Sequence, residues 1–165
     1  MKPSLQPGLT STFTYRVPVE RTVPHVYPES ALFQAMPRVF ATAYLVGLIE
    51  WACIEAMQPH FGPGEQSVGT DIRIDHTAAT PPGFEVRVQV TVERVEGRRV
   101  SFSVRAHDGA ETISQGTHER FVIDRQRFVQ KVEAKATMSS KRKIMLDVLD
   151  SASTLPLRRR RMRRL

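Results

Sequence analysis

The longest apolar stretch of the chain, residues 39–57, predicts a buried helix. Its apolar residues recur at three- and four-residue spacing, glycine and proline are nearly absent, and Pro37 just upstream is a helix-start signal. Between Val39 and Ile54 the only charged residue is Glu50. An ionised carboxylate among apolar side chains is costly, so we expect Glu50 to have a partner, to be protonated or to face a cleft. A satisfied polar group at the edge of the helix fits the pattern as well.

Five other segments alternate between apolar and polar residues, which predicts half-buried strands. They are residues 11–19, 67–77, 84–93, 100–106 and 111–123. Turn signals separate the later ones: TPPG at 80–83, VEGRR at 95–99 and the pair Asp108-Gly109. One strand, one long helix and then four strands predict an α+β layer fold in which an antiparallel sheet wraps the helix.

Residues 22–37 lie between the first strand and the helix and break the alternation. Prolines at 24, 28 and 37 stand among apolar residues that include Val23, Phe33 and Met36. The segment predicts an irregular flap with its own apolar contacts and a short helical turn near 29–34. A surface connection with incidental apolar side chains fits the pattern equally well.

His76 lies on the apolar face of the 67–77 strand, together with Val68, Ile72 and Ile74, so it is expected to point toward the helix. A lone histidine on an apolar face is more often a core residue than a catalyst. Here, however, strand and helix each bring one ionisable group to the same layer. With the Thr42 hydroxyl, they supply the groups that activate a nucleophile and move protons in acyl transfer.

The net charge of +7 is concentrated at the end of the chain. Residues 1–136 hold 15 Lys/Arg and 15 Asp/Glu, whereas residues 137–165 hold nine Lys/Arg and two Asp. We therefore expect one folded domain over 1–136 and a basic, disordered tail over 137–165. A neutral domain argues against a nucleic-acid-binding fold, and leaves only non-specific contact with nucleic acid through the tail.

Several other classes of protein are not expected. No uncharged apolar segment reaches the roughly 20 residues of a membrane span, and the first residues hold no apolar export signal, so we expect a cytoplasmic protein without membrane contact. The sequence has no Cys pair, HExxH, phosphate loop or GxSxG, so neither a metal nor another cofactor is expected. The single cysteine, Cys53, lies in the predicted helix and is expected to be a structural thiol.

Six runs of residues resemble the fluoroacetyl-CoA thioesterase family. They are HVYPES at 25–30, VFATAYLVGLIEWAC at 39–53, DHTAATPPG at 75–83, VEGRR at 95–99, VRAHDG at 104–109 and GTHER at 116–120. They follow one another in order over roughly residues 8–135. The resemblance implies a hotdog fold, in which an antiparallel sheet wraps the long helix, and a homodimer with active sites at the subunit interface.

The resemblance also implies the residues of the site. The catalytic threonine, glutamate and histidine of the family fall on Thr42, Glu50 and His76. Its glycine near the thioester carbonyl falls on Gly69, and its arginine on Arg120. The Gly69 amide is suited to donate to the carbonyl oxygen, because a glycine lets the backbone approach closely. His76 is then the proton-transfer residue, while Glu50 either attacks the carbonyl carbon or acts as a base.

We therefore expect a thioesterase that hydrolyses a short-chain acyl-CoA, with fluoroacetyl-CoA as one candidate, to the free acid and CoA. Val23, Phe33 and Met36 are expected to contact the acyl group. Met36 replaces a phenylalanine in the flap of the fluoroacetyl-specific enzyme, so catalysis is better supported than specificity for a fluorinated substrate. Two alternatives remain: hydration of an enoyl thioester by a related hotdog enzyme, and acyl-CoA binding without catalysis.

One further expectation concerns geometry. Thr42 and Glu50 are eight residues apart in the predicted helix, which separates them by about 12 Å along the axis and roughly 80° around it. No direct bond between them is expected in one straight helix. The site is therefore expected to combine two subunits, or the helix to be distorted near its start or at Gly47.

Overall fold

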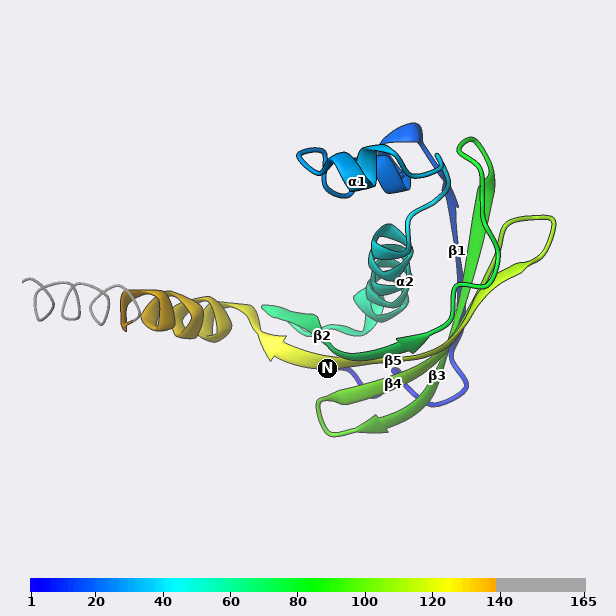
Figure 1. The fold of residues 1–165 in the computed structure, drawn as a ribbon. Coiled ribbons are helices and arrows are strands. Elements are labelled where there is room, and N and C mark those ends of the chain that lie inside the picture. The colour runs from blue at the N-terminus through cyan, green and yellow to red at the C-terminus, as the bar shows by residue number, and fades with distance from the viewer. Residues whose placement is uncertain (139–165) are drawn as a thin grey trace, which may run out of the picture. The chain divides into compact units, whose positions relative to one another are not determined.

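The computed structural model describes residues 1–138, in which a five-stranded antiparallel sheet curves around one long helix (Figure 1). The helix is α2 (Thr42–Met57), and a short helix, α1 (Ala31–Gln34), precedes it. The strands are β1 (Thr10–Arg16), β2 (Glu65–Ile74), β3 (Glu85–Glu96), β4 (Arg99–His107) and β5 (Thr112–Asp124). The order in the sheet is β1-β3-β4-β5-β2, so β1 and β2 form its two edges.

The core forms where the inner face of the sheet meets the buried face of α2. Alternate residues of β3 and β4 point inward and are almost fully buried: Val86, Val88, Val90, Val92, Val100, Phe102, Val104 and Ala106. The helix adds Leu45, Leu48, Ile49, Ala52, Cys53, Ala56 and Met57. The period-2 pattern of the strands and the apolar character of the helix therefore form one core, as the sequence predicts.

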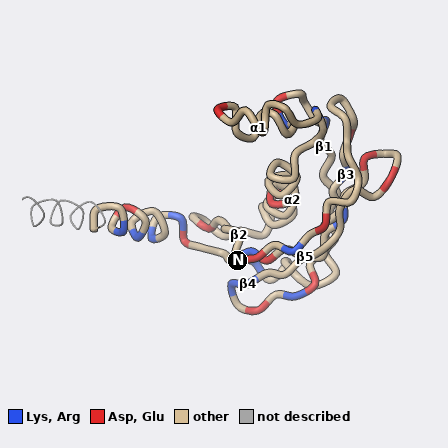
Figure 2. The backbone as a smooth tube through the Cα atoms, viewed as in Figure 1, with Lys and Arg blue, Asp and Glu red and all other residues tan. Residues whose placement is uncertain are grey.

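Acidic and basic residues are interspersed along the strands of the sheet (Figure 2). They pair across and along strands, as in Arg99 with Glu119 at 2.6 Å and Arg73 with Asp71 at 3.2 Å. This intermixing of the two signs agrees with the balanced charge of residues 1–136.

The flap between β1 and α2 consists of 3-10 turns at Val19–Arg21 and Val23–His25 followed by α1. The predicted helical turn in this segment is thus confirmed.

The start of the long helix was predicted three residues too early. The Phe40 amide donates to the Thr80 carbonyl at 2.8 Å, and the Ala41 amide donates to the Arg21 carbonyl at 3.0 Å. Because these tertiary hydrogen bonds keep the residues before the helix extended, α2 begins only at Thr42.

The strand predicted over 67–77 ends at Ile74 and contains a bulge between Gly69 and Asp71. Val68 pairs with Phe121, whereas Ile72 pairs with the buried His118. Residues directly opposite each other share a face, so Val68 lies on the outer face and Ile72 on the inner one. The expectation that both share a face is wrong, because the extra residue of the bulge reverses the alternation.

The chain divides after Arg125 into two compact units. A helix begins at residue 125 and continues to 138, the last residue that the structure describes. The expected boundary between 136 and 137 stays a prediction, and residues 139–165, most of the expected tail, lie outside the described residues. Within 1–138, no helix is both long and apolar enough to cross a bilayer.

Candidate active site

Thr42 and His76 form the first group of candidate residues. Thr42 is the first residue of α2, and His76 follows the end of β2; the Thr42 Oγ1 and His76 Nδ1 atoms lie 2.8 Å apart. Burial lowers the pKa of His76, against the opposing effect of Asp75, so the imidazole is neutral near pH 7 and able to accept a proton. The prediction that His76 points toward the helix is confirmed.

The other ring nitrogen of His76, Nε2, is buried and makes no hydrogen bond of normal geometry to the residues that the structure describes, although the Ala78 backbone lies close enough to the ring to raise its pKa. Buried polar atoms in folded proteins almost always have a partner, so an unpaired one requires an explanation. A cavity of about 230 Å³ adjoins this pair of residues. It is lined by Val23, Val39, Phe40, Thr42, His76, Thr77, Ala78 and Ala79.

Glu50 belongs to a second group of residues, two turns further along α2. Its Oε1 lies 3.6 Å from Nη1 of Arg120 and 3.9 Å from Nε2 of His118. The Glu50 side chain is 42% exposed, whereas Arg120 and His118 are buried. The carboxylate therefore lies at the surface of the domain, next to the buried guanidinium of Arg120. This cation is the partner that an ionised Glu50 is expected to have.

Arg120 is held in place by three hydrogen bonds, in addition to its ion pair with Glu50. Its Nε donates to the Ser67 hydroxyl at 2.9 Å, its Nη2 donates to the Ser67 carbonyl at 3.0 Å, and its Nη1 lies 3.0 Å from Nε2 of His118. Burial lowers the pKa of Arg120, and the Glu50 charge opposes this. Because its ordinary pKa is above 12, the guanidinium remains charged near neutrality.

His118 was not among the predicted site residues, yet its hydrogen bonds fix its tautomer. Nδ1 lies 2.7 Å from the Asp71 carbonyl, which can only accept, so Nδ1 carries the proton and Nε2 accepts from Arg120. Burial lowers the pKa of His118 and keeps it neutral. The strand alternation around GTHER could have indicated its direction, since His118 and Arg120 are two residues apart on one face.

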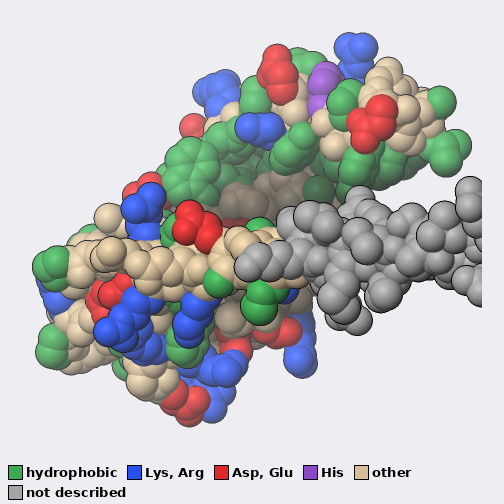
Figure 3. All heavy atoms as spheres, turned by 90° about the vertical axis from the view of Figure 1, so that its left-hand side faces the viewer, with side chains coloured by type: hydrophobic (Ala, Val, Ile, Leu, Met, Phe, Trp, Pro, Cys, Tyr) green, Lys and Arg blue, Asp and Glu red, His purple; other side chains and the backbone are tan. Residues whose placement is uncertain are grey.

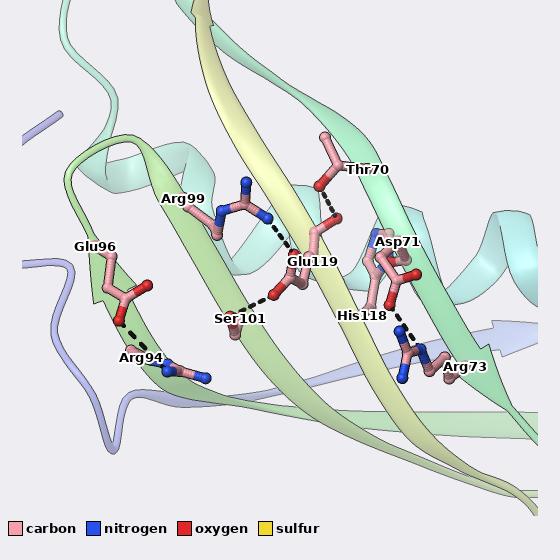
Figure 4. Close-up of polar contacts among 9 residues, drawn as sticks. All are labelled: Thr70, Asp71, Arg73, Arg94, Glu96, Arg99, Ser101, His118 and Glu119. Atoms are coloured by element: carbon pink, nitrogen blue, oxygen red, sulfur yellow. Dashed lines mark hydrogen bonds and ion pairs between the residues drawn. The ribbon is translucent and has the colours of Figure 1, made fainter.

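The neighbouring residue on β5, Glu119, lies on the outer face and takes part in a different network (Figure 4). There it accepts hydrogen bonds from Arg99 and Ser101, while the Thr70 hydroxyl donates to its carbonyl. The bulge residue Thr70 thus lies on the outer side, which leaves Gly69 on the inner side.

Gly69 pairs with Arg120 across the sheet and faces the Glu50 carboxylate. A Cβ atom added at Gly69 would lie 2.3 Å from Glu50 Oε1 and 3.1 Å from His118 Cε1. A larger side chain therefore fits at position 69 only if the Glu50 carboxylate moves. The Gly69 backbone therefore lies directly against the Glu50 carboxylate, and its role as a donor to the thioester oxygen stays a prediction.

Within one chain, the predicted catalytic residues fall into two separate groups. Thr42 meets His76, and Glu50 meets Gly69 and Arg120; α2 is helical throughout this interval, which keeps the two groups about 12 Å apart along its axis. The expectation of a distorted helix is wrong, so the alternative of a site that combines two subunits remains.

Only one of the three residues predicted to contact the acyl group lines the cavity beside His76. Val23 lines the cavity next to His76. Phe33 instead packs edge-on against Tyr27, with ring centroids 5.0 Å apart, and Met36 is half exposed. Neither Phe33 nor Met36 lines this cavity in the structure, and their contact with an acyl group stays a prediction.

Cys53 is a free, buried thiol in α2. Burial raises the pKa of Cys53 to about 12, which makes this thiol unreactive near neutrality. Residues 1–138 contain no cluster of three or more His, Cys, Asp or Glu side chains that could hold a metal ion.

Comparison with known proteins identifies the family. Residues 20–126 match the family described as fluoroacetyl-CoA-specific thioesterase. The fluoroacetyl-CoA thioesterase of Streptantibioticus cattleyicolor is 51% identical over 135 residues, which cover 82% of this chain and 97% of that protein. A solved structure of the fluoroacetyl-CoA thioesterase FlK is also 51% identical, and the match covers 79% of this chain and 97% of the FlK chain with a TM-score of 0.78.

A more distant structure has the same fold. It is a thioesterase superfamily member from Thermus thermophilus, 29% identical, with a TM-score of 0.71 and coverage of 88% of this chain and 99% of that one. These matches confirm the resemblance, the hotdog fold and the thioesterase activity expected from the sequence, and they favour hydrolysis over the two alternative functions. The chain belongs to the fluoroacetyl-CoA-specific thioesterase family and is an acyl-CoA thioester hydrolase.

Proposed function

We propose that the enzyme hydrolyses short-chain acyl-CoA thioesters, with fluoroacetyl-CoA among its substrates, in a homodimer whose active sites combine residues of both subunits. The observation that carries this proposal is the Thr42–His76 pair beside a small apolar cavity, with one imidazole nitrogen buried and unpaired among the described residues. A volume of about 230 Å³ is below the roughly 300–1,000 Å³ of a drug-sized pocket and suits a short acyl group.

The chemistry follows from the two groups of residues. In the proposed site, the acyl group occupies the cavity beside His76, and the Gly69 amide donates to the thioester oxygen as negative charge develops there. His76 donates a proton to the departing CoA sulfur and takes one from the attacking water, directly or through Glu50, so that the imidazole ends neutral. Thr42 positions the acyl group or a water molecule through its hydroxyl. One structure of a FlK variant contains fluoroacetate and CoA, which supports the substrate class.

Glu50 has two possible roles in this scheme, and both begin with an ionised carboxylate. As a base it removes a proton from the attacking water; as a nucleophile it forms an anhydride with the acyl group that water then hydrolyses. Arg120, behind the carboxylate at 3.6 Å, favours the ionised form in either case. A single turnover in ¹⁸O-labelled water separates the roles, since only the anhydride route can leave label in the protein.

Two features support a dimer. Edge strand β2 is open on one side, and it carries Gly69 and leads directly to His76. The flap exposes several large apolar side chains, among them Tyr27, Leu32 and Met36, and apolar groups gather there around a hollow (Figure 3). In the proposed dimer, two β2 edges pair about a two-fold axis, and Glu50 of the partner subunit approaches His76 Nε2.

Mixing inactive variants tests the shared site. Thr42→Ala and Glu50→Gln chains, refolded together in equal amounts, form heterodimers in which one of the two sites has no substitution. About half of randomly formed dimers are mixed, so roughly a quarter of wild-type activity on acetyl-CoA should return. Thr42→Ala mixed with His76→Ala is the matched control, because both residues belong to the same half and no intact site can form.

Two outcomes contradict parts of the proposal. No recovery in the first mixture, with a dimer demonstrated by sedimentation, would show that each site belongs to one chain. No thiol release by the wild type from acetyl-, fluoroacetyl- or propionyl-CoA would refute the substrate class itself. A cytoplasmic location, where CoA esters are formed and used, is part of the proposal and is tested by fractionation.

A further inference from the structure

Phe40 lines both the cavity beside His76 and a second cavity. The second cavity has a volume of about 270 Å³ and is lined by Tyr15, Arg21, Phe40, Tyr44, Gly47, Leu48 and Trp51. Phe40 is the residue common to both linings. Phe40 is only 1% exposed, although it belongs to the lining of both cavities.

The position of Phe40 is fixed by its backbone. Its amide donates to the Thr80 carbonyl at 2.8 Å, and it forms a bridge with Thr22, which is itself fully buried. The Thr80 hydroxyl in turn donates to the Asp108 carboxylate at 3.1 Å. The ring is therefore part of a rigid wall and is unlike the exposed side chain of Met36 in the flap.

The second cavity is suited to hydrocarbon. Aromatic rings and Leu48 form most of its lining, and its cation, Arg21, lies over the Tyr44 ring at 4.8 Å from the centroid. An alkyl chain that passed Phe40 would lose contact with water and meet apolar groups.

We propose that Phe40 determines the acyl-chain length that the enzyme accepts, by closing the acyl cavity against the second cavity. The inference rests on the proposed function, in which the acyl group lies beside Thr42 and His76. It adds the limit on substrate size and names a residue of the wall, distinct from the flap, that sets it.

Replacing Phe40 tests this limit. Phe40→Ala should join the two cavities and raise the ratio of kcat/KM for hexanoyl-CoA to that for acetyl-CoA by at least roughly tenfold, the lower bound for one added methylene in an apolar pocket. Phe40→Val removes less volume and should raise the ratio less. Phe40→Leu, which keeps most of the wall, should change it least.

Leu45→Ala is the matched control. Leu45 is as buried as Phe40, but it lines neither cavity, so its truncation costs stability without opening the wall. Its hexanoyl-to-acetyl ratio should equal that of the wild type. Thermal unfolding of every variant shows which of them are folded, and Phe40→Val keeps the test available if Phe40→Ala does not fold.

Trp51 supplies an independent readout, because it is the only tryptophan in the chain and it lines the second cavity. Hexyl-CoA, a thioether that cannot be hydrolysed, should change tryptophan fluorescence in Phe40→Ala but not in the wild type. Ethyl-CoA, which carries the same CoA group, should change neither.

The outcomes distinguish the inference from the function on which it rests. Acetyl-CoA hydrolysis by the wild type with an unchanged ratio in folded Phe40→Ala and Phe40→Val would overturn the role of Phe40 alone. A wild type inactive on all short thioesters would overturn both. An equal rise in the ratio for Leu45→Ala would show that loosening of the core, and not the opening of this wall, admits longer chains.

Discussion

Substitution of Gly69 by alanine offers a direct test of how the Glu50 carboxylate is positioned. The new Cβ would lie 2.3 Å from Glu50 Oε1, and ordinary contact begins at 3.4 Å, so the oxygen must move by about 1.1 Å. Glu50 can yield because its side chain is half exposed, whereas the His118 ring is buried and held at both nitrogens. The carboxylate is therefore the group that moves.

A displacement of about 1 Å at a reacting group can cost roughly 10²-fold in rate, which corresponds to about 2.7 kcal/mol of transition-state stabilisation. We expect kcat/KM on acetyl-CoA to fall by about that factor. The fold should be less affected, because the loss of chain entropy in the unfolded state stabilises by roughly 0.4–1 kcal/mol and opposes the crowding at His118. Thiol release and thermal unfolding measure the two effects separately.

Gly47→Ala is the control, since a Cβ atom there meets nothing within 4 Å. It should stabilise α2 by roughly 0.5–1 kcal/mol and leave kcat/KM unchanged. A further comparison uses Glu50→Asp, whose shorter side chain withdraws the carboxylate, so Gly69→Ala should cost less in that background. Full activity of a folded Gly69→Ala enzyme would refute the reasoning.

Four other predictions follow from the same geometry and from the sequence. Because burial lowers the pKa of His76, kcat/KM should be constant near pH 7 and fall only below about pH 6.5, as the imidazole gains a proton; a decline that begins above pH 7 would contradict this. His118 also has a lowered pKa, with Arg120 and Glu50 facing it, so the unfolded state takes up its proton first as the pH falls. The free energy of unfolding should therefore decrease below about pH 6.5, and less steeply in His118→Gln; equal slopes in urea titrations would exclude this contribution. Met36→Phe should increase selectivity for fluoroacetyl-CoA over acetyl- and propionyl-CoA, because a rigid ring seals a small pocket better than a flexible methionine; unchanged kcat/KM ratios would show that position 36 does not gate the site. Removal of residues 137–165 should leave kcat/KM unchanged, apart from a salt-sensitive steering effect on the polyanionic substrate; a large loss at both low and high salt would contradict it.

Much of the fold follows from local patterns in the sequence. The alternation in β3 and β4 predicts which side chains are buried, because the geometry of a strand places every second residue on one face whatever its neighbours are. Asp108-Gly109 predicts a hairpin for an equally local reason: Gly109 has a φ of 95°, and the Asp108 carboxylate accepts hydrogen bonds from the amides of Ala110 and Glu111. Resemblance in short runs then identifies the family.

Only the tertiary structure decides where these elements depart from their local patterns. Thr42 begins the helix because distant carbonyls hold Phe40 and Ala41 extended, and Gly69 faces inward because β2 has one more residue than β5 between their pairings. Neither effect can be predicted from the pattern of apolar and polar residues, since each depends on a partner strand or loop that is remote along the chain.

The same limit applies to the site. The sequence predicts that Thr42, Glu50 and His76 act together. In one chain, however, the straight helix places Glu50 next to Arg120 and His118. Thr42 contacts His76 instead. His118 and Phe40 went unnoticed because one resembles an ordinary strand residue and the other an ordinary core residue. Their significance arises from what each touches, an arginine in one case and two cavities in the other, and such contacts exist only once the chain has folded.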